Sequence, residues 1–242
     1  MRRTPTDSAQ ADKRTVWHQS PVARGQTAPL VSAIDDRLRS MLSDGVFVAG
    51  AKLNENALAQ QLQVSRSALR EAVRGLEQLG LVTIVPNRGV FVRQVGLSEI
   101  FDLFDVHAGL ARSAGRLLAT RVTVQQFRDL EAQHEAMLAA NRVAAVDQYR
   151  TLNARFHNDL FGFAGNARLC SLHSGIAAEL QLSRRHNLHT LHQLRASILE
   201  HARILEAIRA RDEERTGRAF ERHVLAGKRR IADTIATATT AA

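Results

Sequence analysis

The chain has 242 residues, a length that suits one large domain or two small ones. Hydrophobic residues make up 45% of it, enough for a substantial core, yet no run reaches the roughly 18 apolar residues that a membrane span requires. The formal net charge of +9 permits binding to nucleic acid. One cysteine, Cys170, excludes an intrachain disulfide, so we expect a reducing, cytoplasmic setting and no membrane partner.

The N-terminal stretch, residues 1–28, is rich in Thr, Gln, Ser and Pro and lacks the apolar block of a secretory signal, so we expect a mobile arm. A helix is predicted after Pro29, because apolar residues then recur at spacings of four. These residues are Leu30, Ile34, Leu38 and Leu42. The pair Asp44–Gly45 is expected to end this helix.

The next segment predicts two short helices and a hairpin. Asn54 can cap the first helix and Ser65 the second, and Gly80 ends the second. The runs LVTIV and VFVRQV then read as two strands joined by the turn residues PNRG. Three helices followed by a two-stranded hairpin predict a winged helix-turn-helix over residues 29–94.

From Ser98 onward the strand signals disappear and six helical stretches follow. They are expected near residues 98–119, 123–141, 143–162, 166–185, 190–210 and 212–236. Short breaks at Gly165, Asn187 and Arg211–Asp212 separate the later ones. Helices joined in this way predict an antiparallel bundle over residues 98–236. The fold class is therefore mainly α, with a winged helix-turn-helix before the bundle.

The run LNENALAQQLQVSRSALREAVRGLEQLGLVTIVPNRGVFV resembles the winged helix of GntR-family regulators, which bind DNA. In helix-turn-helix proteins the first turns of the second helix enter the major groove of double-stranded DNA. Arginine can bind guanine there with two hydrogen bonds, and a glycine-arginine wing tip suits a narrow minor groove. The expected DNA-binding residues are Ser65, Arg66, Ser67, Arg70, Arg88 and Gly89. The alternative is that Arg66 and Arg70 are solvated surface charges, with an ion pair to Glu71 within the chain.

The C-terminal half resembles the FCD effector domain through the runs LNARFHNDLF, LEHARILEAIRARD and AFERHVLAGKRR. The resemblance implies that Asn153, His157, His201 and His223 hold a divalent metal such as zinc or nickel inside the bundle. Asn153 and His157 are four residues apart and so share one helix face. Three neutral imidazoles leave coordination positions for water or a ligand. The alternative is three histidines that hydrogen-bond in the core without a metal.

The first effector-domain helix departs from the family pattern, which has an arginine and a glutamate where this chain has His107 and Ala111. A carboxylate effector is therefore less strongly implied than in other members. The candidate effector contacts are His107, Arg150 and Arg184. Either arginine can also be an ordinary exposed charge.

The sequence as a whole predicts a ligand-responsive transcription regulator and not an enzyme. We expect a homodimer that binds a palindromic operator and represses transcription until a small metabolite, such as an organic acid, binds near the metal. The alternatives are a helical-bundle metalloenzyme and an architectural DNA-binding protein. A di-iron enzyme needs a second Glu-x-x-His element beside Glu131 and His134, and the chain has none.

Overall fold

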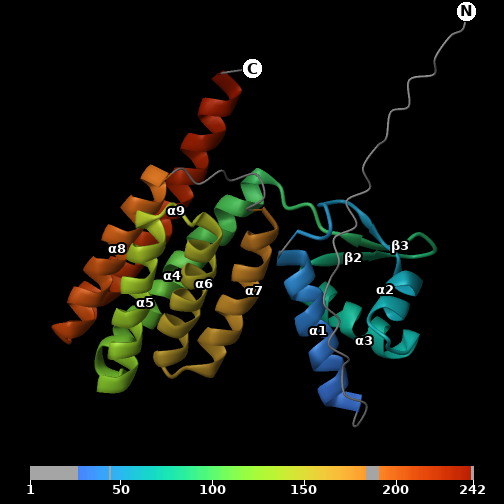
Figure 1. The fold of residues 1–242 in the computed structure, drawn as a ribbon, viewed down its shortest axis with the longest axis horizontal. Helices are drawn as coiled ribbons and strands as arrows, with labels where there is room; N and C mark the ends of the chain where they lie inside the picture. The colour runs from blue at the N-terminus through green and yellow to red at the C-terminus, as the bar shows by residue number, and fades with distance from the viewer. Residues whose placement is uncertain (1–26, 44, 184–190, 241–242) are drawn as a thin grey trace, which may run out of the picture.

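The computed structural model describes residues 27–43, 45–183 and 191–240, which form two lobes side by side (Figure 1). A small sheet and three helices make up the N-terminal lobe, and helices make up the described part of the C-terminal lobe. This arrangement confirms the predicted mainly α fold class. Of the expected arm, residues 1–28, only 27 and 28 fall within the described part, and they already belong to the first helix.

Three helices pack together in the N-terminal lobe: α1 (Thr27–Ser43), α2 (Glu55–Gln61) and α3 (Arg66–Gln78). The apolar stripe of α1 turns inward, so Ile34, Leu38 and Leu42 are buried. They pack in one cluster with Leu69 and Leu76 of α3. Burying each such side chain contributes about 1.5–3 kcal/mol, so this stripe determines which face of α3 is left outside.

A three-stranded antiparallel sheet completes the lobe, in the order β1 (Lys52–Leu53), β3 (Gly89–Val92), β2 (Val82–Val85). The expected hairpin is present as β2 and β3. The additional strand β1 was not expected, and it pairs Lys52 with Phe91 and Leu53 with Val90. Its pairing places the segment before α2 against the hairpin, which is the wing of this lobe (residues 82–92).

The C-terminal lobe contains the six helices expected of it: α4 (Leu97–Arg121), α5 (Val124–Arg142), α6 (Val146–Phe163), α7 (Ala167–Ser183), α8 (Leu191–Arg209) and α9 (Glu213–Thr240). Its core includes Leu118, Phe156, Phe161 and Phe220, all fully buried. Within the described ranges, no helix is both long and apolar enough to cross a bilayer.

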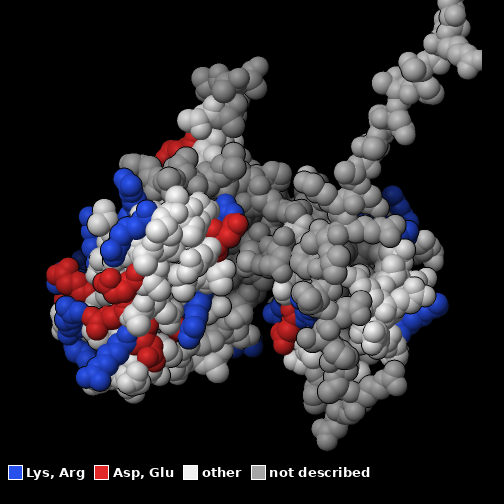
Figure 2. Space-filling model, viewed as in Figure 1, with Lys and Arg blue, Asp and Glu red and all other residues white. Residues whose placement is uncertain are grey.

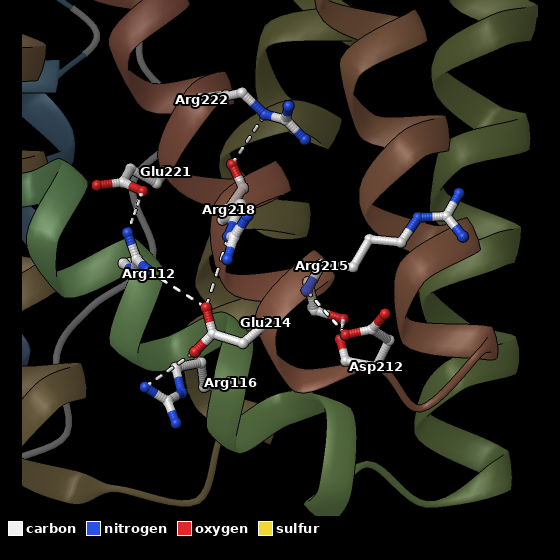
Figure 3. A network of polar contacts seen from close by, with 9 residues as sticks. Arg112, Arg116, Asp212, Glu214, Arg215, Arg218, Glu221 and Arg222 are labelled. Carbon is white, nitrogen blue, oxygen red and sulfur yellow. Dashed lines mark hydrogen bonds and ion pairs between the residues drawn. The ribbon is translucent and has the colours of Figure 1, made fainter.

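Helices α4 and α9 make the most extensive contact in the C-terminal lobe. They approach so closely because two glycines face each other. A Cβ added to Gly115 would lie 2.9 Å from the Cα of Gly217, and one added to Gly217 would lie 2.9 Å from the carbonyl oxygen of Arg112. Beside this contact Glu214 pairs with Arg112 at 3.3 Å and with Arg116 at 3.1 Å (Figure 3). Because these charges are half-exposed, the glycine contact contributes more to the packing than the ion pairs.

The two lobes meet where α7 packs against the N-terminal lobe. Leu182, near the end of α7, joins the hydrophobic cluster of the winged helix. Arg93, just after β3, donates to the Glu179 carboxylate of α7 at 2.6 Å and also pairs with Glu99 of α4. Burial raises the pKa of the Glu179 carboxyl, and Arg93 opposes that shift. An ion pair and an apolar side chain therefore both cross the boundary between the lobes.

Replacing Gly115 by alanine is expected to destabilise the chain, because the new methyl group would push against the α9 backbone. Overpacking of this kind costs about 1–3 kcal/mol. The matched control is Gly109→Ala in the same helix, where no described atom lies within 4 Å of an added Cβ. That control should gain about 0.5–1 kcal/mol from helix propensity. Urea unfolding followed by circular dichroism measures both, and equal effects would contradict the close contact.

Candidate nucleic-acid interface and metal centre

The N-terminal end of α3 is capped by Ser65 and points out of its lobe. The Ser65 backbone is extended, and its Oγ accepts a hydrogen bond from the N–H of Ala68 at 3.1 Å. The same Oγ lies 3.0 Å from the Oγ of Ser67. Because the opposite face of α3 is buried, Arg66, Ser67 and Arg70 are exposed. Three predicted residues thus lie together at one helix end, while Ser65 has a structural role there.

A hollow of about 970 Å³ opens between this end of α3 and the wing. It brings together five of the six residues predicted to bind DNA. These are Arg66, Ser67, Arg70, Arg88 and Gly89. Lys52 and Arg74 also line the hollow, so its basic side chains outnumber its two acidic ones, Glu55 and Glu71. In Figure 2 the charged side chains visible at the outer edge of the N-terminal lobe are basic.

Two ion pairs cross the floor of the hollow, and neither is strong. Arg70 Nε lies 3.4 Å from Glu55 Oε1, and the arginine side chain is 71% exposed. Glu71, the partner suggested from the sequence, pairs with Arg74 at 3.3 Å. Exposed pairs of this kind are worth about 0–1 kcal/mol. A phosphate or a base edge can therefore compete for both arginines.

Lys52 is the residue of this face that sequence reasoning missed. Gly89 has a φ of +104°, and a Cβ built there would lie 2.9 Å from Lys52 Cε. The lysine stem thus crosses over the glycine, and its amine reaches the hollow between helix and wing. A two-residue strand has no periodicity to detect, and the basic residue type was the one signal available. Gly89 consequently serves the packing of Lys52 as well as the turn.

Three histidines converge inside the C-terminal lobe, each from a different helix. The Nε2 atoms of His157 (α6) and His201 (α8) are 3.4 Å apart. That of His223 (α9) lies 3.3 Å from His201 and 3.0 Å from His157. His201 and His223 are buried, and His157 is half-buried. The fold therefore brings together the three histidines that the FCD resemblance had singled out.

A carboxylate orients one of these rings. Glu200 lies 2.7 Å from His223 Nδ1, so the Nδ1–H donates to it, and Arg230 donates to its two oxygens at 2.8 and 3.1 Å. Burial opposes the charged carboxylate, but the hydrogen bonds from His223 and Arg230 lower the pKa of Glu200. Burial, assisted by the neighbouring His223, holds the pKa of His201 well below its usual value. The contact with Glu200 leaves the His223 Nε2 lone pair directed at the centre of the cluster, and the neutral His201 ring has a lone pair on one of its two nitrogens.

The donor set fits a divalent metal. Metal–nitrogen bonds of about 2.0–2.1 Å place coordinating nitrogens about 2.9–3.4 Å apart, which matches the Nε2 triangle. In neutral rings each Nε2 either donates or accepts, so three mutual contacts cannot all be hydrogen bonds and at least one sets like groups face to face. The Oδ1 of Asn153, one turn before His157, is buried without a hydrogen-bond partner among the described residues. Its role as an oxygen ligand of the same metal stays a prediction.

His107 lies apart from this cluster, in a second histidine pair. Its Nε2 is 2.9 Å from His173 Nδ1, and His173 Nε2 is 3.1 Å from the Asn158 oxygen. Both rings stack on Phe161, which in turn contacts Phe220 at a centroid distance of 5.1 Å. His107 is buried, and two successive phenyl rings, Phe161 and Phe220, connect it to His157 of the three-histidine cluster. His173 had not been identified from the sequence, because only the fold brings α7 against α4.

Of the two remaining predicted effector residues, Arg150 does not join either histidine group. Arg150 faces solvent and pairs with Asp147, one turn away on α6, at 3.1 Å. Arg184 lies outside the described residues. The structure therefore brings together most of the predicted metal and DNA residues but leaves Arg150 on the surface.

The sequence matches two known families. Residues 30–92 match the bacterial regulatory proteins of the gntR family, and residues 102–226, just over half of the chain, match the FCD domain. The chain is similar to the Nta operon transcriptional regulator of Aminobacter aminovorans, with 34% identity over 57% of this chain and 65% of that protein.

It is also similar to YdhC, an uncharacterised helix-turn-helix transcriptional regulator of Bacillus subtilis, with 28% identity over 79% of this chain and 84% of that one. Among solved structures, McbR/YncC of Escherichia coli superposes with a TM-score of 0.73 and 21% identity. The superposition covers 86% of this chain and 97% of that protein, and at this identity it establishes the fold alone.

Replacing Ser65 by alanine is expected to destabilise the winged helix by about 1 kcal/mol, because the N–H of Ala68 loses its cap. The matched control is Ser67→Ala, which removes an exposed hydroxyl that caps nothing and should change stability by less than about 0.5 kcal/mol. Thermal unfolding of both variants measures the difference. A larger loss in the Ser67 variant would contradict the capping role.

Proposed function

Since this chain belongs to the GntR family of bacterial regulatory proteins and carries an FCD domain, we propose that it represses transcription by holding operator DNA until a small metabolite binds its helical lobe. It is a DNA-binding transcription regulator and not an enzyme. Repression is the sign that the family resemblance implies. Because its partner is operator DNA, we place the protein in the cytoplasm.

In this proposal the N-terminal end of α3 enters the major groove of double-stranded DNA. The observation that carries it is the basic hollow between α3 and the wing, where the predicted residues lie together. Arg66 and Arg70 are one turn apart and exposed, so both can reach base edges. Arg88 at the wing tip then contacts the minor groove, and Lys52 a phosphate between the two.

We further propose that two chains pair and present two such helices to a palindromic operator. A two-fold dimer places a second winged helix about one turn of the duplex away from the first, which matches an inverted-repeat site. One winged helix alone contacts few bases, so a second winged helix is needed for specific affinity at physiological salt.

The metal in this proposal is held by His157, His201, His223 and Asn153. Three imidazoles and one amide oxygen suit zinc or nickel, and when bound such an ion offers open positions to a ligand atom. Glu200 keeps the His223 ring in the orientation that coordination needs. The neutral Asn153 adds no negative charge, so an organic acid is a compatible ligand.

Of the three residues expected to contact the effector, His107 has the placement that best supports the proposal. It is buried in the same lobe as the metal site and is linked to α7 through His173. Because α7 packs against the winged helix, a ligand that shifts the His107–His173 pair can alter how the winged helix is held. A coupling of about 1–3 kcal/mol would change operator affinity about 5- to 150-fold.

Replacing Arg66 by alanine should lower the preference for operator over random DNA by about 5- to 150-fold for each winged helix, since a bidentate contact to guanine is worth about 1–3 kcal/mol. The control Arg37→Ala removes an equally exposed arginine from α1, outside the hollow, and should leave that preference unchanged. Fluorescence anisotropy with both duplexes, at two salt concentrations, measures the ratio of affinities. Unchanged selectivity in the Arg66 variant would remove α3 from the groove.

The His157→Ala and His201→Ala variants should each lose bound divalent metal, because two imidazoles hold an ion far less tightly than three. The control His134→Ala removes a buried histidine that contacts the Ile198 carbonyl, outside the cluster, and should keep its metal. Elemental analysis of the purified chains, with a melting curve for each, separates metal loss from unfolding. A folded His157 variant with a full equivalent of metal would refute the site.

A further inference from the structure

A cleft of about 300 Å³ lies between the two lobes, away from both sites described above. One wall comes from the N-terminal lobe and includes Arg39 of α1, and the other comes from α6 and α7 and includes Asn158. The volume is at the lower end of the range for small-molecule sites, which starts at about 300 Å³. α1 and α7 face each other where the lobes meet (Figure 1). A molecule bound here would touch both lobes at once.

Arg39 brings a partly satisfied positive charge to the cleft. Its guanidinium pairs with Asp35, one turn earlier, through one nitrogen at 2.6 Å. Its Nε is buried and makes no hydrogen bond to any described residue. A guanidinium has five N–H donors, so the Asp35 pair leaves donors for an anion. Of the described residues that line the cleft, Arg39 is the one charged side chain, and Asp35 beside it balances part of its charge.

Asn158 brings a second donor from the opposite wall. Its Oδ1 accepts the Nε2–H of His173, which fixes the amide orientation and turns the NH₂ group away from that ring. His173 Nδ1 then accepts from His107 Nε2–H, 2.9 Å away. The amide at the cleft is thus the outer end of a hydrogen-bond chain that reaches into the bundle.

The rest of the lining is mixed, because apolar side chains stand beside the polar Ser40, Ser174 and Gln181, so a compact apolar group can pack on only part of it. Leu42 and Leu81 of the N-terminal lobe and Leu182 of α7 line the cleft, and all three are buried. Ala177 and Ala178 line it as well and leave room because their side chains are small. A ligand that satisfies this surface needs an anionic end for the two donors and an apolar body for the leucines.

We propose that this interlobe cleft is a second small-molecule site, which binds a carboxylic acid with a compact apolar body. The carboxylate accepts from Arg39 and Asn158, and the apolar body packs on Leu42, Leu81 and Leu182. Because the two donors belong to different lobes, the ligand binds only while the lobes keep this arrangement. By linkage it stabilises that arrangement over any other that operator DNA selects.

Isothermal titration calorimetry of the full-length chain with benzoate tests the site, with benzyl alcohol as the same ring without a carboxylate. We expect saturable benzoate binding, and binding of benzyl alcohol weaker by about tenfold or more. Arg39→Gln should weaken benzoate by at least about tenfold. The matched control is Arg37→Gln, two residues away in α1 and exposed outside the cleft, which should stay within about twofold.

Asn158→Asp serves as a second variant, because it keeps an acceptor for His173 and sets a negative charge against the ligand carboxylate. It should weaken benzoate as Arg39→Gln does, and melting curves confirm that both variants fold. Asn153→Ala, which alters the three-histidine site, should bind benzoate as the unmodified chain does. Absence of saturable binding, or unchanged affinity in both cleft variants, overturns the proposal. Loss of binding in the Asn153 variant would also overturn it, because the carboxylate would then belong to the metal centre.

Discussion

Three imidazole nitrogens, one each from α6, α8 and α9, meet at one point inside the C-terminal lobe. Their separations of 3.0–3.4 Å are too short for three neutral rings to satisfy one another. In the proposed function, a divalent cation would turn this repulsion into coordination. The packing that permits the meeting lies elsewhere, because α9 must approach α4 through the contact of Gly115 with Gly217. The Gly115–Gly217 contact thus helps to place His223 of α9 beside the other two histidines.

Helix α7 links the core of the C-terminal lobe to the winged helix. His173, near its middle, stacks on Phe161 beside the buried histidines. Two turns later Glu179 receives Arg93 from the end of the wing, and Leu182 enters the core of the winged helix. Helix α7 therefore contacts both the core of the C-terminal lobe and the core of the winged helix. In the proposed function, a ligand that shifts α7 would change how the winged helix meets a duplex.

Much of this architecture could be predicted from the sequence, because local signals and periodicity agree with the fold. Asn54 and Ser65 cap the helices they were expected to cap, and the apolar stripe of α1 faces the core as its spacing indicated, with Leu30 partly buried and the other three residues buried. The two-residue strand β1 escaped detection because its pairing with β3 is a tertiary contact. Lys52 was missed for the same reason.

The candidate sites, too, could be predicted from local patterns only where their residues are close in sequence. The spacing of Asn153 and His157 indicates one helix face, but only family resemblance could add His201 and His223 from distant helices. No local pattern joins His107 to His173, since they are brought together by the packing of α4 on α7. Arg150 had the right charge for an anion partner, yet its helix face turns outward to Asp147. Residue type suggests a chemistry, and packing decides whether it is available.

The X-ray absorption spectrum of the zinc-loaded full-length chain tests the central claim most directly, because it reports the atoms around the ion. We expect three imidazole nitrogens and at least one oxygen at about 2.0–2.1 Å from the ion, with no sulfur. A spectrum with two or fewer imidazoles, or with a sulfur neighbour at about 2.3 Å from the single cysteine, would contradict it.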